Sequence, residues 1–360
     1  METKYPHLIV AYGSNLDAED WKAYCERNDA DRSCLQFEDV VIIPGYKLTF
    51  DTASRSRGGG VLNIAPGDAH VTYAGLYSTN DEGLCLLRRK EGVPHKYEEV
   101  EVSVIKHDGS EIRALTYSVP QHRSEGYVRP SKSYLRICKQ GYESIGIDTQ
   151  PLLDAADKIP LDPLRGVFTY GTLMRGERNF PSVQARGVEV ALMGQIFGQL
   201  STNGSFPGLD LSVQNFAWGD YFVSKGIEKL LADLDIIEGF KGYGNPSNFY
   251  RRTCVWVDVG AVGQRLAWVY VRDEPFDTLL MSNDWRALNG NRKLFTEQVV
   301  DEHARNNPDL KELLRNEINR FGKEASSVID LKEIAQMLEA GTTLSEHKLA
   351  QISGNWTALI

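Results

Sequence analysis

Two short stretches of the chain place a tyrosine, a glycine and a hydroxyl side chain directly after an apolar segment. The first is Tyr12-Gly13-Ser14, continued by Asn15 and Leu16; the second is Tyr170-Gly171-Thr172, continued by Leu173 and Met174. Where a chain leaves a strand at a glycine, successive backbone N–H groups can converge on an anion, because glycine permits a close approach. Each stretch therefore predicts a turn that binds an anionic group.

A Glu-Gly pair follows each stretch at a similar distance. Glu91 lies 79 residues after Tyr12, and Glu238 lies 68 residues after Tyr170. A carboxylate can accept a proton and return it, which makes each glutamate a candidate general base beside the predicted anion site. A single Glu-Gly pair is more often a solvent-facing residue and a helix stop, so the argument depends on the repeat. The repeat predicts two related domains in tandem, each with an anion-binding turn and a carboxylate base.

Length and composition argue against several classes of protein. A chain of 360 residues is longer than one hydrophobic core usually serves, so two domains are expected. The net charge of −9 disfavours non-specific nucleic-acid binding, which needs a basic surface. No apolar run reaches the ~18 residues of a membrane span, and the N-terminus does not resemble a signal peptide. We therefore expect a cytoplasmic protein without a membrane or nucleic-acid partner.

The cysteines and histidines show no ligand spacing. The seven histidines form no HxxH or HxH pattern, and the five cysteines are scattered without a CxxC pair. We therefore expect reduced thiols, no metal site and no cofactor.

The segments around these residues read mainly as strands. In the first half, β-branched and aromatic residues predict strands at 40–49, 60–65, 71–77, 97–105 and 112–119, and apolar spacing predicts helices at 17–27, 81–90 and 130–142. The second half repeats this order, with strands near 191–200, 219–223, 251–259 and 264–271 and a helix at 226–237. No strand–helix alternation is seen, which favours closed or strongly curved mixed sheets.

The expected fold class is α+β, with two tandem mixed β-barrel domains and a C-terminal helical segment. We place the first domain at 1–150, a linker with three prolines at 151–164, the second domain at 165–290 and a helical extension at 291–360. The extension is predicted from two amphipathic stripes that end at Gly322 and Gly341.

The ordered motifs resemble two branches of one superfamily over residues 7–285. The first half resembles the γ-glutamylcyclotransferases in Tyr12-Gly13-Ser14-Asn15-Leu16, the segment 60–67, Glu91-Gly92-Val93 with Tyr97, and Pro130-Ser131 with Tyr134. The second half is similar to the AIG2-like branch, which includes γ-glutamylamine cyclotransferases, in the segment 167–173, Phe206-Pro207-Gly208-Leu209, Leu234-Asp235 with Glu238-Gly239, and Tyr250-Arg251-Arg252.

The resemblance implies a reaction in which a γ-glutamyl amide is cleaved by its own α-amine, giving 5-oxoproline and a free amine. It assigns the base to Glu91 and Glu238, and substrate binding to Tyr134, Tyr250 and the two turns, in which the backbone amides would hold the substrate carboxylate. Tyr12 and Tyr170 could equally be core aromatics that end a strand. The exchange of Ser14 and Asn15 for Thr172 and Leu173 implies that the two pockets accept different amines.

Some alternatives stay open from the sequence. The chain could be a γ-glutamyl-binding protein without activity, or a biosynthetic enzyme that removes a γ-glutamyl protecting group from a larger amine. The segment 240–249 in the second half could be a lid or a long loop. Asn63 more often satisfies backbone groups than it binds substrate. Arg55, Arg57 and the glycines 58–60 could form a phosphate-binding loop, but they lack the GxxxxGK(S/T) pattern, so a flexible rim beside the pocket is favoured.

Overall fold

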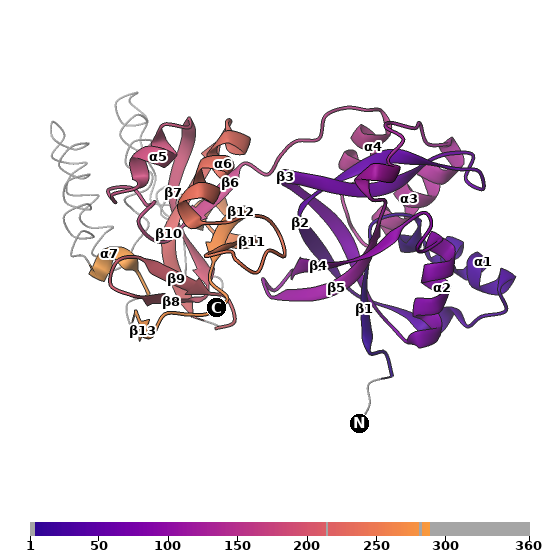
Figure 1. Cartoon of the computed structure of the whole chain (residues 1–360), viewed down its shortest axis with the longest axis horizontal. Coiled ribbons are helices and arrows are strands. Elements are labelled where there is room, and N and C mark those ends of the chain that lie inside the picture. Colours follow the sequence, from indigo (N-terminus) through magenta and orange to yellow (C-terminus); the bar gives the residue numbers. More distant parts are fainter. Residues whose placement is uncertain (1–3, 214, 281–282, 289–360) are drawn as a thin grey trace. The chain divides into compact units, whose positions relative to one another are not determined.

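The structure is a computed structural model that describes residues 4–213, 215–280 and 283–288. The chain divides into two compact units, Met1–Pro163 and Leu164–Ile360, and each holds one closed barrel of five strands (Figure 1). The expectation of an α+β chain with two tandem mixed barrels is confirmed. The helical extension expected at 291–360 lies outside the described residues.

The first unit surrounds its barrel with short helices. Its strand order is β1-β3-β2-β4-β5, and a parallel contact between β1 and β5 closes a sheet whose other pairs are antiparallel. With η marking a 3-10 helix, its elements are β1 (His7–Ala11), η1 (Ser14–Leu16), α1 (Ala18–Arg27), η2 (Arg32–Cys34), β2 (Leu35–Ser54), β3 (Gly59–Thr79), α2 (Asp81–Glu91), β4 (Glu98–Lys106), β5 (Glu111–Ser118), η3 (Gln121–Arg123), α3 (Lys132–Ser144) and α4 (Gln150–Ala156).

One long strand replaces two expected strands in this unit. The sequence predicts strands at 60–65 and 71–77, whereas β3 runs unbroken from Gly59 to Thr79. Pro66 pairs with Tyr46 next to a register shift in β2, a position where the missing N–H of proline is tolerated. The shifts bend the β2–β3 hairpin without ending it.

The segment expected to be a linker, 151–164, is partly helical. Residues 150–156 form α4, whose Leu152, Ala155 and Ala156 are buried in the core of the first unit. The three prolines of the segment therefore do not prevent a helix, because Pro151 occupies its first turn, where no N–H is needed.

The second unit repeats the barrel with different surroundings. Its strand order is β10-β6-β12-β11-β7, closed by a parallel contact between β12 and β6, and a separate three-stranded sheet has the order β13-β8-β9. Its elements are β6 (Gly166–Thr169), α5 (Phe180–Gln184), β7 (Val188–Phe197), β8 (Gln199–Thr202), β9 (Pro207–Asp210), β10 (Phe216–Ser224), α6 (Ile227–Glu238), β11 (Arg251–Asp258), η4 (Gly260–Val262), β12 (Gln264–Val271), β13 (Thr278–Leu279) and α7 (Trp285–Leu288).

The strand expected at 191–200 is divided at Gly198. Before this residue β7 pairs with β10 in the barrel, and after it β8 pairs with β9 in the small sheet. A side chain at Gly198 would place its Cβ 2.6 Å from Leu209, so a glycine permits the close packing at which the chain changes sheets.

The two helices that carry the glutamates end in the same way. Gly92 and Gly239 cap α2 and α6 in the left-handed conformation, with φ of 69° and 66°, which glycine adopts without steric cost. Glu91 and Glu238 are therefore the last residues of helices that are anchored by buried leucines: Leu84, Leu86 and Leu87 in α2, and Leu230, Leu231 and Leu234 in α6.

A buried ion cluster fixes the segment after the second turn. Asp220 on β10 is fully buried, and it accepts hydrogen bonds from the backbone N–H of Arg175 (2.8 Å) and from the Arg286 guanidinium (3.2 Å). Burial alone would raise the pKa of Asp220, but the charges of Arg175 and Arg286 outweigh it and lower the pKa. The cluster ties β10 and α7 to the chain that leaves the turn.

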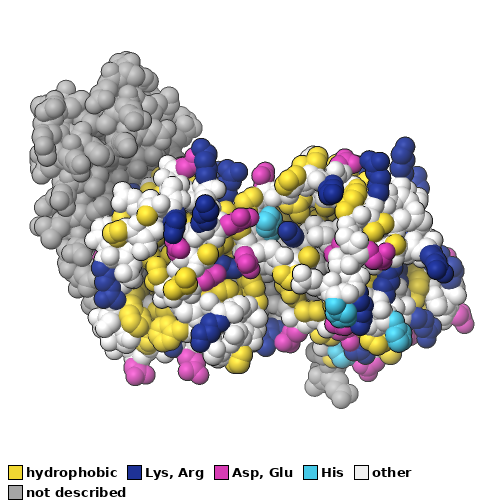
Figure 2. All heavy atoms as spheres, turned by 45° about the horizontal axis from the view of Figure 1, so that its top comes forward, with side chains coloured by type: hydrophobic (Ala, Val, Ile, Leu, Met, Phe, Trp, Pro, Cys, Tyr) yellow, Lys and Arg dark blue, Asp and Glu magenta, His cyan; other side chains and the backbone are white. Residues whose placement is uncertain are grey.

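In the part of the chain that the structure describes, no helix is long and apolar enough to cross a membrane. On the face shown in Figure 2, Lys and Arg side chains are interspersed with Asp and Glu.

Candidate functional site

The two Tyr-Gly turns follow β1 and β6 and have related hydrogen bonding. The N–H of Leu16 donates to the Gly13 carbonyl (3.0 Å), and that of Met174 donates to the Gly171 carbonyl (2.9 Å). The sequence assigned all amides of each turn to the substrate, but these two close the turn itself. Amides that begin such a turn have no acceptor within it, so the donors that the turns leave for an anion are those of residues 13–15 and 171–173.

The hydroxyl groups of the two turn tyrosines have equivalent partners, in each barrel the backbone carbonyl of a tyrosine near the end of a strand. The hydroxyl of Tyr12 donates to the carbonyl of Tyr117, and that of Tyr170 donates to the carbonyl of Tyr270 (2.6 Å). Both side chains are buried. They fix each turn to the strand end beside it, which is the structural role that the sequence left open.

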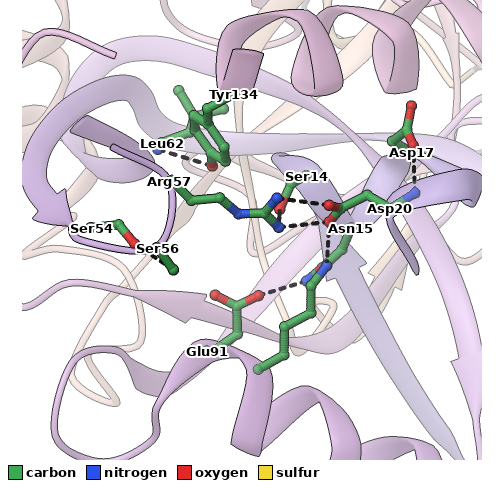
Figure 3. A network of polar contacts seen from close by, with 11 residues as sticks. Ser14, Asn15, Asp17, Asp20, Ser54, Ser56, Arg57, Leu62, Glu91 and Tyr134 are labelled. Carbon is green, nitrogen blue, oxygen red and sulfur yellow. Dashed lines mark hydrogen bonds and ion pairs between the residues drawn. The ribbon is translucent and has the colours of Figure 1, made fainter. Parts of the chain in front are cut away.

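Glu91 lies against the first turn. The side-chain amide of Asn15 donates to its Oε1 at 2.7 Å (Figure 3). The pKa of Tyr12 is raised by burial and, to a lesser degree, by Tyr97 and by the charge of Glu91. The carboxylate and the turn of the first barrel are therefore neighbours, as the repeat predicts.

Three charged residues support Asn15, of which the sequence placed only Arg57 beside the pocket. The ammonium of Lys90 donates to the Asn15 Oδ1 (2.6 Å) and to Asp20 (2.9 Å), and the guanidinium of Arg57 binds both oxygens of Asp20 at 2.7 Å (Figure 3). Burial acts to raise the pKa of Asp20, but Arg57 and Lys90 outweigh it and lower the pKa to about 2. Arg57 is thus an anchored residue, and the interpretation as a flexible rim is wrong for its side chain.

Tyr134 lies beneath the first turn. It is 4% exposed, and its hydroxyl accepts the N–H of Leu62 (3.3 Å), while Tyr97 donates to the Leu62 carbonyl (2.8 Å). In the second barrel the hydroxyl of Tyr250 donates to the Pro207 carbonyl (2.6 Å). This contact corresponds to the hydrogen bond from Tyr97 to the Leu62 carbonyl in the first barrel. Pro207 has no N–H, so it cannot donate a hydrogen bond of the kind that Leu62 donates to Tyr134.

The second barrel has a cavity of about 220 Å³ between its turn and its glutamate. Burial raises the pKa of Glu238 to about 7, a value suited to proton transfer near neutral pH. Of the residues expected here, all but Met174 line the cavity; the lining comprises Phe168, Thr169, Tyr170, Gly171, Thr172, Leu173, Arg178, Asn179, Phe206, Pro207, Ile237, Glu238, Phe249, Tyr250 and Tyr270.

Phe249, the last residue of the segment 240–249, lines this cavity. Phe249 packs edge-to-face on Phe206, with ring centroids 5.9 Å apart. The guanidinium of Arg272 lies 4.6 Å from the Phe249 ring centroid and donates to its carbonyl (3.1 Å). Asn248 closes the segment on itself by donating to the Gly242 carbonyl (2.8 Å) and accepting from the Lys241 N–H (2.7 Å). The sequence could not place Phe249, because aromatic side chains in an insertion carry no periodic signal.

Asn63 satisfies backbone groups, as the sequence indicated. It is buried, its Oδ1 accepts the N–H of Val119 (2.9 Å), and its Nδ2 donates to Asp51 (3.0 Å). It therefore fixes β3 to the chain after β5. In the described ranges, 4–213, 215–280 and 283–288, no group of three His, Cys, Asp or Glu side chains is placed to hold a metal ion.

The glycines of the two turns should differ in their tolerance of a methyl group. A Cβ on Gly171 would lie 2.5 Å from Cγ of Pro207, a rigid ring, whereas on Gly13 its nearest neighbour would be the Tyr134 hydroxyl at 3.7 Å. We expect Gly171→Ala to destabilise its unit by about 1–3 kcal/mol, as overpacking does, and Gly13→Ala to have a smaller effect. Urea unfolding of both variants checks this, and equal losses would contradict it.

Comparisons with known proteins agree with the repeat. A family model described as "Gamma-glutamyl cyclotransferase, AIG2-like" matches residues 9–136 and 167–287. A solved structure titled "Gamma-glutamyl cyclotransferase" is 26% identical, with a TM-score of 0.35, and the match covers 44% of this chain and 88% of that one. An AIG2-like protein from Mus musculus is 20% identical, with a TM-score of 0.26, over 31% of this chain and 80% of that one.

YkqA from Bacillus subtilis is 14% identical, with a TM-score of 0.29, and its match covers 75% of this chain and 85% of that one. A search of curated proteins found no match.

Proposed function

The chain belongs to the γ-glutamyl cyclotransferase, AIG2-like family, and from this premise we propose that each barrel cleaves a γ-glutamyl amide by intramolecular cyclisation, releasing 5-oxoproline and a free amine. The observation that carries the proposal is the cavity of the second barrel, which the turn and Glu238 line together. In the first barrel the hydrogen bond from Asn15 to Glu91 supports the same arrangement.

The turns would hold the α-carboxylate of the glutamyl group. The amides of Ser14 and Asn15 in one barrel, and of Thr172 and Leu173 in the other, are donors not used by the turn itself. Backbone N–H groups that converge in this way bind carboxylates without a charged side chain. With the carboxylate held, the α-amine and the γ-carbonyl of the same molecule are confined near one another, which replaces much of the work of a catalytic nucleophile.

The glutamates would move the proton. The α-amine is mostly an ammonium ion at neutral pH, and it can attack only after a base takes a proton from it. Glu91 or Glu238 accepts this proton, the amine nitrogen forms a bond to the γ-carbon, and the bond from that carbon to the leaving nitrogen breaks. The same carboxyl group then returns the proton to the leaving nitrogen. The ring nitrogen also gives up a second proton on becoming the lactam N–H, and the released amine takes that proton up and leaves as an ammonium ion, so the glutamate is regenerated as a carboxylate.

The second pocket would favour an amine with an apolar or aromatic part. Phe206, Phe249 and Ile237 line it beside Glu238, and Phe249 is 49% exposed at its edge. This wall also fits the removal of a γ-glutamyl group from a larger amine product, because the wall is open to solvent. The chemistry is the same in both cases, and only the leaving group differs.

The proposal is tested by incubating the chain with γ-glutamyl-alanine and with γ-glutamyl-benzylamine and measuring 5-oxoproline and free amine. We expect equal amounts of both products, and we expect the benzylamide to be processed by the second barrel. Tight binding of 5-oxoproline without turnover of either amide would instead identify a binding protein.

A further inference from the structure

Lys90 is a buried cation whose ammonium group makes two hydrogen bonds at the first site. Its side chain is 7% exposed, and the Nζ donates to Asn15 and Asp20. The Nζ also lies 5.7 Å and 5.6 Å from the ring centroids of Trp21 and Tyr24 on α1. A charge removed from water needs such partners. Lys90 is therefore held in one place, next in sequence to Glu91.

This ammonium group determines how the Asn15 amide faces. An ammonium ion has donors only, so the atom that it contacts at 2.6 Å is the amide oxygen of Asn15. The amide nitrogen must then face the other way, where it lies 2.7 Å from the Glu91 Oε1. A carboxylate only accepts hydrogen bonds, and it receives this one from a donor that cannot rotate away without losing the bond to Lys90.

The support extends two residues further. Asp20 accepts from Lys90 with one oxygen and from Arg57 with both, and its side chain is 9% exposed. These residues come from α1, the β2–β3 hairpin and the end of α2, so three elements meet at the Asn15 turn. We call Arg57, Asp20, Lys90 and Asn15 the positioning chain.

We propose that Lys90 and Asn15 are positioning residues of the first barrel, and that they hold the Glu91 carboxylate at the place where it takes the proton of the substrate's α-amine. The proposal rests on the cyclotransferase function proposed above. It assigns to the Asn15 side chain a role separate from that of its backbone amide in the turn.

The second barrel offers a natural contrast. Leu173 stands third after Tyr170, as Asn15 stands third after Tyr12, and Ile237 precedes Glu238 as Lys90 precedes Glu91. Both replacements are hydrocarbon side chains that line the cavity with Glu238. The two barrels therefore differ at these two positions beside their glutamates: the first has the hydrogen-bonded Asn15 and Lys90, and the second has two hydrocarbon side chains.

The test uses the full chain with Glu238→Gln, so that turnover reports the first barrel, and γ-glutamyl-alanine as substrate. We expect Lys90→Met and Asn15→Leu each to lower kcat by about tenfold or more, with KM changed less than about twofold, since a misplaced base slows the chemical step while the backbone amides still bind the substrate. The double variant should lose no more than the stronger single variant, because both changes break one chain of contacts.

Asn15→Asp separates the two contacts of Asn15. An aspartate keeps an acceptor for Lys90 but has no N–H for Glu91, so kcat should fall as in Asn15→Leu. Lys139→Met serves as the control, since Lys139 forms an exposed ion pair with Glu143 on α3, and it should leave kcat unchanged. Thermal unfolding of each variant distinguishes a misplaced base from an unfolded unit.

Unchanged kcat in folded Lys90→Met or Asn15→Leu would overturn the positioning role, and so would full activity of Asn15→Asp. A rise in KM with constant kcat would also overturn it, because it would assign the residues to binding. Absence of 5-oxoproline from the Glu238→Gln chain itself is a different result, which would refute activity of the first barrel and with it the positioning chain.

Discussion

Glu91→Gln should abolish turnover by the first barrel and leave the second unchanged, and Glu238→Gln should do the reverse. Glutamine has nearly the shape of glutamate but cannot take a proton from the substrate's ammonium group. Loss of a general base typically costs about 10²- to 10⁴-fold in rate, so each single variant should retain the activity of one barrel only. Steady-state assays of 5-oxoproline with both test amides would show this division.

The double variant, Glu91→Gln with Glu238→Gln, provides the control for this experiment. It should bind 5-oxoproline, because the turns are intact, but should form none from either amide. If the double variant keeps the turnover of the unaltered chain, neither glutamate is the base. If one single variant removes all activity, only one barrel is an enzyme under these conditions.

The sequence predicted the glutamate positions well because the signals are local. Apolar residues at helical spacing followed by a glycine predict where α2 and α6 end. Gly92 and Gly239 have the left-handed conformation that ends a helix in this way. The end of a strand at a Tyr-Gly pair is equally local. The same order of motifs in both halves indicated that the turn and the glutamate lie close together, and Gly171 and Glu238 both line the cavity of the second barrel.

The contacts of the positioning chain at the first site could not be predicted from the sequence. Asp20, Arg57 and Lys90 lie on segments far apart in the chain, and the ion pairs of Asp20 with Arg57 and Lys90 leave no spacing pattern. The barrel itself closes through the parallel pairing of β1 with β5, in which Ile9 is the partner of Leu115. The sequence predicts two strands in place of β3, with a break near Pro66. A proline is tolerated there because the partner strand β2 is irregular, and this irregularity is visible only in the strand pairing.

The contrast between the two barrels has a consequence for proton transfer. The first site places a polar donor on its glutamate, whereas the second places its glutamate among Ile237, Leu173 and Phe249. Burial removes the Glu238 carboxyl group from water and disfavours its charged form. A base held in this way takes a proton more readily, at the cost of being protonated already when the solution is mildly acidic.

The second barrel should therefore lose activity as the pH falls through about 7. Burial raises the pKa of Glu238 from 4.5 to about 7, so below pH 7 most of the population carries a proton on Glu238 and cannot accept another. In the Glu91→Gln chain, kcat/KM for γ-glutamyl-benzylamine should fall about tenfold for each pH unit below this midpoint. An acidic limb near pH 4.5 instead would show that Glu238 is solvated or is not the base.

Stability should respond to the same proton with a defined sign. The pKa of Glu238 is higher in the folded chain than the ordinary value of 4.5, so the folded state binds the proton more tightly than the unfolded state does. This contribution is fully present below pH 4.5, and it is lost as the pH rises to about 7. Urea midpoints of the unaltered chain should therefore decline across this window relative to those of Glu238→Gln, which has no titrating group there. Parallel midpoint curves would mean that burial does not perturb the carboxyl group, and the proton-transfer argument for the second barrel would lose its physical basis.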